Sequence, residues 1–94
     1  MFTTKVPNFK GSYKPFEHFG KVVRDADGKI VKIVEFKDTS EKEKTITEIN
    51  PGIYMFNSNW LWQYAAKIKN ENAQAEYYLT DIVEVAITHG EEVQ

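Results

Sequence analysis

The clearest pattern in the chain is a pair of β-rich runs on either side of an Asp-Gly turn. The runs Gly20 to Asp25 and Lys29 to Phe36 contain the β-branched residues Val22, Val23, Ile30, Val31, Ile33 and Val34, and Asp27 and Gly28 lie between the two runs. Such a pattern is a strong signal for a β-hairpin. Glu35 stands near the end of the second run, where its carboxylate either reaches solvent or contacts a ligand. We therefore predict a hairpin over residues 20–36.

Two later segments have the apolar spacing of helices. In the segment nearer the C-terminus, the apolar residues form a stripe at positions i, i+3, i+4, i+7 and i+8. They are Leu79, Ile82, Val83, Ala86 and Ile87. This spacing is typical of an amphipathic helix. We expect the helix to begin at Thr80 and Asp81, with Asp81 and Glu84 as a variant of the capping box, and to end at Gly90. Residues 91–94 look like the approach to another strand.

The other helix follows a turn at residues 57–59 that offers several N-caps. Its apolar positions are Trp60, Leu61, Tyr64, Ala65 and Ile68. We expect this helix to end near Asn70, and the cluster from Trp60 to Trp62 to belong to the core.

The remaining segments are less regular. Residues 45–50 and 52–56 have strand-like composition, but Pro51 lacks a backbone donor and predicts an edge, a bulge or a kink that frees Asn50 for a ligand. The charged stretch 37–44 is predicted to be a solvated loop or a short helical turn. Residues 1–19 mix prolines and glycine with aromatic side chains, which indicates an extended segment laid over an apolar surface.

Length and composition limit the possible classes of protein. The chain has 94 residues, of which 41% are hydrophobic, and it contains no cysteine. A single globular domain is therefore expected, without disulfides, thiolate metal sites or a cysteine nucleophile. No run is long and apolar enough for a membrane span or a signal peptide, so the expected location is the cytoplasm, with no membrane partner.

Charge is distributed unevenly along the chain. Residues 1–47 hold ten Lys and Arg against seven Asp and Glu, whereas residues 48–94 hold two against seven. The basic residues either face an anionic ligand or form a solvated surface of mixed charge. They are too dispersed for a nucleic-acid patch, so no nucleic-acid partner is expected.

The stretch from Asn72 to Asp81 is the strongest candidate for a binding loop. Its side-chain amides both donate and accept hydrogen bonds, and Tyr77 and Tyr78 supply flat apolar faces with a polar tip. The helix that starts at Thr80 would direct free backbone N–H groups toward the loop, an arrangement that favours phosphate. One hypothesis is therefore a sugar-phosphate site; the other is an ordinary capped loop with solvated amides.

Other apparent motifs lack the residues that their chemistry requires. Asp25 to Gly28 has the form of a calcium-loop start, but Lys29 and Phe36 fall where oxygen ligands belong, which favours the hairpin turn. His18 and His89 have no partners at ligand spacing. No glycine-rich phosphate loop, Ser/His/Asp set or carboxylate pair is present, so we predict no catalytic residue and no metal ligand.

Four segments of the chain together resemble the ordered motifs of the sugar-1-phosphate nucleotidyltransferases. They are Phe19 to Asp25, Ile33 to Asp38, Glu48 to Tyr54 and Asn72 to Asp81. The resemblance is closest to the uridylyltransferase domain of the bifunctional UDP-N-acetylglucosamine pyrophosphorylases. It implies an α/β fold, as a fragment of a Rossmann-like nucleotide-diphospho-sugar transferase domain with a β-hairpin, a further strand and two helices. Residues 1–94 would form one partial domain, with residues 20–94 as its sugar-binding part.

The resemblance also implies five substrate-binding residues. Gly20 matches a glycine whose backbone approaches the sugar, Glu35 a carboxylate that accepts from sugar hydroxyls, and Asn50 an amide that recognises the ring or its N-acetyl group. Tyr78 and Thr80 match positions on the sugar and phosphate side of the site.

The chain departs from the family pattern at four positions. Phe19 and Lys21 stand in place of the usual Tyr and Arg, Pro51 in place of a small hydroxyl residue, and Ala75 in place of a glycine.

The implied ligands are a sugar-1-phosphate or a UDP-sugar. In the family, Mg²⁺ and basic residues stabilise the charge that passes to pyrophosphate. The motifs for the triphosphate and the metal are not found in this chain, so we expect no bound Mg²⁺ and no nucleotidyl transfer by the chain alone. The alternative is a non-catalytic interaction domain that binds another protein or a second copy of itself through exposed apolar surface.

Overall fold

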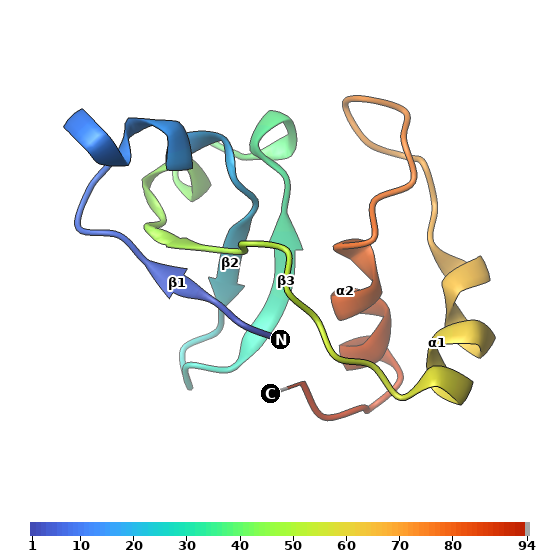
Figure 1. The fold of residues 1–94 in the computed structure, drawn as a ribbon. Coiled ribbons are helices and arrows are strands. Elements are labelled where there is room, and N and C mark those ends of the chain that lie inside the picture. Colours follow the sequence, from blue (N-terminus) through green and yellow to red (C-terminus); the bar gives the residue numbers. More distant parts are fainter. Residues whose placement is uncertain (94) are drawn as a thin grey trace.

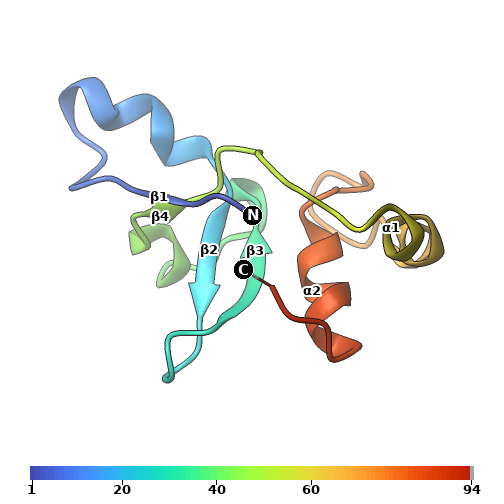
Figure 2. The ribbon, with the colours of Figure 1, turned by 60° about the horizontal axis from the view of Figure 1, so that its bottom comes forward.

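A computed structural model describes residues 1–93 of the chain. A four-stranded antiparallel sheet forms one layer, helix α2 (Asp81–Thr88) packs beside strand β3 (Ile30–Val34), and helix α1 (Ser58–Tyr64) lies on the far side of α2 (Figure 1). Figure 2 shows the same order of layers from a second direction. The predicted mixed α/β fold is confirmed.

The predicted hairpin is formed by β2 (Lys21–Arg24) and β3, which pair antiparallel with an irregularity between Val23 and Arg24. Its turn is held by the Asp25 carboxylate, which accepts from the backbone N–H groups of Asp27 and Lys29, each at 2.9 Å. Asp25 thus stabilises a turn, as Asp commonly does.

The sheet has the order β1-β4-β2-β3. Strand β4 (Glu48–Ile49) pairs with β2 on one side and with β1 (Thr4–Lys5) on the other. The first strand was not predicted. It pairs with β4 over only two residues, so its sequence carries no alternation long enough to indicate a strand.

The core lies between the hairpin and α2, where Val22 and Ile33 contact Ile82 and Val83. The apolar stripe of α2 is therefore confirmed, except that Leu79 precedes the helix and is half exposed. Gly90 ends the helix in the left-handed region, at φ 75°. The backbone N–H groups of residues 90 and 91 return to the carbonyls of Ile87 and Ala86, as in a Schellman motif. Residues 91–93 are irregular, and residue 94 lies outside the described residues.

The capping box predicted at Asp81 and Glu84 is wrong. The N-cap is Thr80, and its side chain makes no capping bond. A capping box exists elsewhere: the Ser40 N–H donates to the Glu43 carboxylate at 2.9 Å, and the Glu43 N–H donates to the Ser40 hydroxyl at 3.1 Å. It starts the 3-10 helix η3 (Glu43–Thr45), which confirms a short helical turn in the charged stretch.

Helix α1 is shorter than predicted. The Asn57 side chain caps it by accepting from the Trp60 N–H at 3.1 Å, and the chain tightens into the 3-10 helix η4 (Ala65–Lys67) after Tyr64. The prediction that Trp62 belongs to the core is wrong, because its side chain is 77% exposed. Trp60 is partly buried and stacks on Tyr64.

The N-terminal segment is only partly extended. Residues Gly11–His18 form the 3-10 helix η1, which corrects the prediction of an extended stretch up to residue 19. Lys21 fixes this segment to the sheet: it is fully buried, donates to the Glu17 carbonyl at 2.7 Å and lies 4.0 Å from the centre of the Phe9 ring. Burial lowers the pKa of Lys21.

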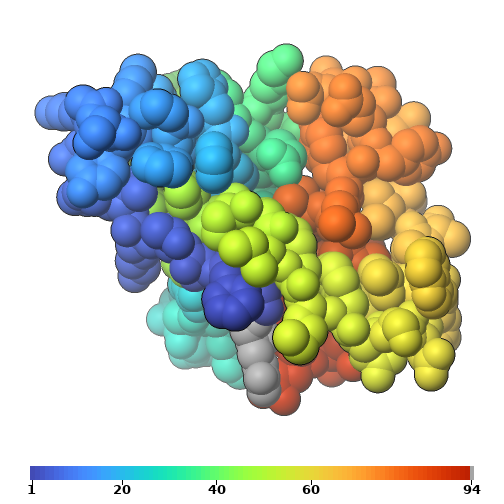
Figure 3. All heavy atoms as spheres, viewed as in Figure 1, coloured from blue at the N-terminus to red at the C-terminus, as the bar shows by residue number. Residues whose placement is uncertain are grey.

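Residues 52–56 are not a strand. Gly52 has φ 86°, and the chain leaves the sheet there. The segment runs alongside the first residues, with the Phe2 N–H donating to the Ile53 carbonyl at 3.1 Å. Figure 3 shows the two segments side by side, in dark blue and yellow-green. Across residues 1–93, no helix is both long and apolar enough to pass through a bilayer.

Candidate functional site

All five residues that the family resemblance implies lie around one hollow, which we call the Glu35 hollow. It has a volume of about 410 Å³ and opens between the end of β3, the bend that follows β4 and the segment that precedes α2. Its lining consists of Gly20, Glu35, Asn50, Pro51, Gly52, Tyr54, Tyr77, Tyr78, Leu79 and Thr80. Four parts of the chain thus meet at one place: Gly20, Glu35, residues 50–54 and residues 77–80.

The Glu35 carboxylate is oriented by Thr80. The Thr80 hydroxyl, in a buried residue, donates to Glu35 Oε1 at 2.9 Å. Glu35 Oε2 has no hydrogen-bond partner within residues 1–93. The carboxylate therefore keeps one acceptor oxygen for a ligand.

Gly20 leaves room for this carboxylate. A Cβ atom at Gly20 would lie 3.0 Å from Ile33 Cγ2 and 3.5 and 3.6 Å from the two carboxylate oxygens of Glu35. The Gly20 carbonyl accepts from the Asn50 N–H at 2.9 Å. The backbone of Gly20 is thus packed between the core and the hollow, and a side chain there would displace one of them.

Asn50 is less free than its position beside Pro51 indicated. Its Oδ1 accepts from the Gly52 N–H at 3.0 Å, and its Nδ2 donates to the Tyr54 hydroxyl. The amide therefore holds the bend, which corrects the expectation that irregular backbone would free it. A side-chain amide has two N–H donors, so one remains for a ligand.

Tyrosine rings form much of the wall. Tyr78 is partly buried, and its hydroxyl accepts from Gln74 Nε2 at 2.6 Å. Burial raises the pKa of Tyr54, and the negative charge of Glu35 raises it further against the opposing bond from Asn50. Tyr54 was not predicted as a site residue. The signal for it was the Asn-Pro-Gly turn, which brings the side chain four positions after Asn50 back onto the amide.

The start of α2 does not offer free N–H groups. The N–H groups of Asp81, Ile82 and Val83 donate to the carbonyls of Tyr78, Leu79 and Thr80 at 3.0–3.2 Å. The prediction of a phosphate on this helix end is therefore wrong in its mechanism, because a preceding turn already satisfies these donors.

The electrostatics of the hollow also disfavour phosphate. No Lys or Arg is among the residues that line it. Burial raises the pKa of Asp81 at the helix start, and the carboxylates of Glu84, Asp38 and Glu35 raise it further, which indicates a locally negative environment. A neutral group rich in hydroxyls fits the donors and acceptors better than an anion does.

The part of the chain that the structure describes contains no evident binding site for a metal ion. Nowhere in residues 1–93 do three His, Asp or Glu side chains come together in a group that could hold one. The described residues therefore offer no such group for Mg²⁺, and no step proposed below depends on it.

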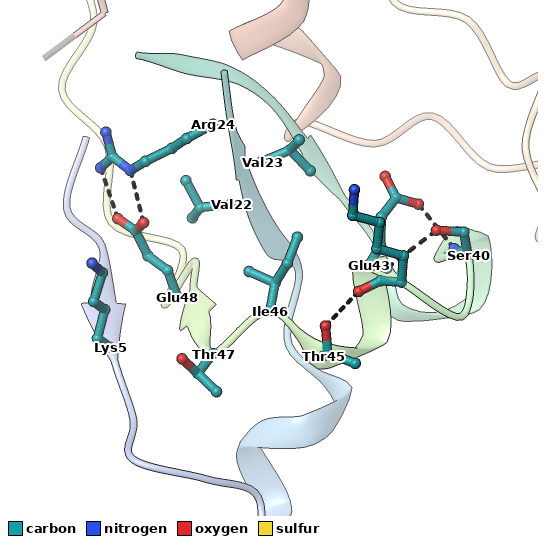
Figure 4. Close-up of a pocket in the computed structure, with 11 residues that line it drawn as sticks. Lys5, Val22, Val23, Arg24, Ser40, Glu43, Thr45, Ile46, Thr47 and Glu48 are labelled. Atoms are coloured by element: carbon teal, nitrogen blue, oxygen red, sulfur yellow. Dashed lines mark hydrogen bonds and ion pairs between the residues drawn. The ribbon is translucent and has the colours of Figure 1, made fainter. Parts of the chain in front are cut away.

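A second hollow, of about 700 Å³, lies on the other side of the β4 segment, and its polar side chains stabilise the fold. Figure 4 shows Arg24 and Glu48, two of its lining residues, bonded directly to each other. Arg24 donates from Nε and Nη2 to the two carboxylate oxygens of Glu48 at 2.7 and 2.8 Å, and the Thr3 hydroxyl donates to Glu48 as well. This network joins the hairpin to β4 and the N-terminal segment.

Comparison with known proteins finds relatives that are similar to most of this chain. The chain is 48% identical over 75 residues to the bifunctional protein GlmU of Brevibacillus brevis, covering 80% of this chain and 16% of that protein. It is 50% identical over 72 residues to the protein of the same name from Pseudomonas fluorescens, covering 77% of this chain and 16% of that protein. For the protein from Alkaliphilus oremlandii the identity is 48% over 85 residues, which are 90% of this chain and 17% of the relative.

The chain thus spans about one sixth of the length of these relatives. The family model described as nucleotidyl transferase matches residues 4–94, which is nearly the whole chain. This chain therefore belongs to the nucleotidyl transferase family.

Proposed function

We propose that the Glu35 hollow binds the sugar ring of a sugar-1-phosphate or a UDP-sugar, with N-acetylglucosamine as the sugar. The chain would thus be the sugar-binding portion of a nucleotidyltransferase that makes UDP-N-acetylglucosamine. The observation that carries this proposal is the meeting of Gly20, Glu35, Asn50, Tyr78 and Thr80 around one hollow.

The polar atoms left over in the hollow match a sugar. Glu35 Oε2 accepts from a hydroxyl, the second N–H of Asn50 donates to a hydroxyl or to the acetamido carbonyl, and the faces of Tyr77 and Tyr78 pack against apolar C–H groups. Because no basic side chain lines the hollow, the phosphate points out of it.

An NMR titration of the labelled chain with UDP-N-acetylglucosamine tests this function. We expect localised shifts in the amide signals of residues 20, 35, 50 and 80. The Asn50→Ala variant should lose them, whereas Asn59→Ala, which removes an exposed amide in α1 outside the hollow, should keep them. N-acetylglucosamine-1-phosphate should reproduce the shifts, and UMP should not. A well-dispersed spectrum without shifts would contradict the proposal.

We further propose that the 94-residue chain does not transfer nucleotidyl groups by itself. The described residues include neither a metal-binding group nor basic side chains in the hollow, and the reaction needs both kinds of charge stabilisation. Release of pyrophosphate from UTP and N-acetylglucosamine-1-phosphate by the pure chain would contradict this.

A second candidate function is a non-catalytic interaction domain that associates with a second copy of the chain. It is favoured by an apolar surface beside the N-terminus, where Phe2, Ile53 and Met55 are 62%, 56% and 86% exposed. Exposed apolar clusters of this kind promote association. A mass that rises with concentration in light scattering, without a response to UDP-sugars, would favour this function over the first.

A further inference from the structure

Asp38 lies outside the lining of the Glu35 hollow but is connected to it through hydrogen bonds. It ends the 3-10 helix η2 (Phe36–Asp38), three residues after Glu35. Its Oδ1 accepts from the Ala73 N–H at 2.7 Å, a contact that spans 35 positions of the chain. Its Oδ2 is buried and has no hydrogen-bond partner among residues 1–93.

The segment that Asp38 holds is an internally bonded turn. Asn72 Oδ1 accepts from the N–H groups of Gln74 and Glu76, both at 3.2 Å, and Asn72 Nδ2 donates to the Glu76 carbonyl at 2.6 Å. Gln74 Nε2 then donates to the Tyr78 hydroxyl. These hydrogen bonds connect the turn to Tyr78, and the bond from Ala73 to Asp38 connects the turn to the end of η2.

Tyr78 also separates two hollows. It lines the Glu35 hollow on one side and, together with Asp38, a hollow of about 680 Å³ on the other. A change in the attachment of the turn would consequently shift the wall of the Glu35 hollow at Tyr78.

We propose that Asp38 is a positioning residue for the Glu35 hollow: it anchors the Asn72 turn through the Ala73 N–H and holds the Tyr78 ring in the wall. This inference rests on the function proposed above, because it assigns Tyr78 to the sugar side of the site.

The hydrogen bonding around the Tyr78 hydroxyl supports the inference. The hydroxyl accepts from Gln74, so its own proton is left to be donated, and the unpartnered Asp38 Oδ2 is a neighbouring acceptor. Burial raises the pKa of Tyr78, and the Gln74 bond opposes this; the charge of Asp38, the capacity of its side chain to accept from the hydroxyl, and then the charge of Glu76 raise the pKa further. The negative charge of Asp38 therefore favours the protonated form of the Tyr78 hydroxyl.

Two variants separate attachment from charge. Asp38→Asn keeps an oxygen that can accept from the Ala73 N–H but removes the negative charge, whereas Asp38→Ala removes both. Asp27→Ala is the matched control, because Asp27 is an exposed turn residue whose side chain makes no hydrogen bond or ion pair among the described residues.

The first readout needs no ligand. In chain labelled at the tyrosine ring carbons, we expect the titration midpoint of Tyr78 to move down in both Asp38 variants and to stay unchanged in Asp27→Ala. Tyr54, whose pKa responds to Glu35, serves as the internal control. The Ala73 amide proton should shift strongly only in Asp38→Ala. If a folded Asp38 variant left the Tyr78 midpoint and the Ala73 amide signal unchanged, the inference would be wrong.

The second readout is the affinity for UDP-N-acetylglucosamine. We expect Asp38→Ala to weaken binding about tenfold, which corresponds to the loss of roughly one hydrogen bond that orients the wall. Asp38→Asn should restore most of the affinity. Equal affinity in wild type and Asp38→Ala would overturn the positioning role. A wild-type chain that does not bind would overturn the proposed function instead, and the ligand-free readout would still decide whether Asp38 holds Tyr78.

Discussion

The hydroxyl of Thr80 donates to the carboxylate of Glu35 at 2.9 Å, across 45 positions of the chain. This bond joins the start of α2 to the end of the hairpin, the two elements that form the core. It also selects which carboxylate oxygen is left for a ligand, since Oε1 is occupied and Oε2 is not. Stability and the sugar recognition proposed above would therefore depend on the same hydroxyl.

Replacing Thr80 tests this relationship. Thr80→Val keeps the shape of the buried side chain but removes the donor, so we expect the free energy of unfolding to fall by about 1 kcal/mol. The response of the Glu35 amide to UDP-N-acetylglucosamine should fall with it. Thr80→Ser retains the hydroxyl and should keep that response. Urea denaturation and NMR titration measure the two effects, and full ligand response in folded Thr80→Val would show that Thr80 does not orient Glu35.

Gly20 is a second position at which stability and binding should change together. In Gly20→Ala the new methyl group would press on Ile33 and approach the Glu35 carboxylate, so we expect a loss of about 1–2 kcal/mol together with a loss of sugar binding. Gly28→Ala is the contrasting variant, because Gly28 has φ 79° and no atom within 4 Å of the new carbon. It should lower stability through backbone strain and leave binding intact. Equal binding by both variants would argue against close packing at Gly20.

The pair of Arg24 and Glu48 predicts a dependence of stability on pH. Hydrogen bonds from Arg24 lower the pKa of the buried Glu48 carboxyl below its ordinary value of 4.5, and the Thr3 bond and the charges of Arg24 and Lys5 add to this. A carboxyl with a lowered folded-state pKa stabilises the fold above its unfolded-state pKa, and this contribution disappears as the pH falls through the folded-state value.

The measurement compares unfolding free energies of wild type and Glu48→Gln between pH 7 and pH 2. At pH 7 we expect the variant to be less stable by about 1 kcal/mol, a modest value because Arg24 is partly exposed. The difference should shrink once the pH drops below 4.5. Parallel curves over the whole range would mean that the pair contributes nothing that depends on the Glu48 proton.

Ala75 has a strained backbone conformation. It has φ 53°, and it is the only residue other than glycine with positive φ among residues 1–93. We expect Ala75→Gly to raise the free energy of unfolding by about 0.5–1 kcal/mol, because glycine adopts this conformation without a Cβ clash. Ala73→Gly, two residues earlier at an ordinary φ, should have the opposite effect. Thermal unfolding of the two variants decides the point, and a destabilised Ala75→Gly would refute it.

The sequence predicted best those elements whose signals are local. The hairpin depends on Asp25 to Lys29, which form the turn through neighbouring backbone groups, and α2 depends on a stripe that is buried as expected. The strand-like composition of residues 52–56 was misleading, because apolar side chains that pack inward do not require a partner strand. Tyr54 and Phe56 do pack inward, but no described strand pairs with them.

The residues of the candidate site could be predicted from the sequence, but the hydrogen bonds among them could not. The family resemblance named five residues that the fold brings together, whereas the roles of Tyr54 and Asp38 depend on long-range contacts. Asp38 contacts a turn 35 positions away, and nothing in the spacing of the two segments indicates this. The same limit applies to the helix start, where a turn of residues 78–80 uses donors that a helix end would normally leave free.

The placement of the two tryptophans determines what fluorescence can report. Both belong to α1, and neither lines the Glu35 hollow. Trp62 is in water in the folded state, whereas Trp60 has a buried indole nitrogen without a hydrogen-bond partner in residues 1–93 and leaves its apolar surroundings only when α1 detaches. A shift of the emission maximum therefore follows the unfolding of the helical layer through a single indole, and sugar binding should leave the spectrum unchanged.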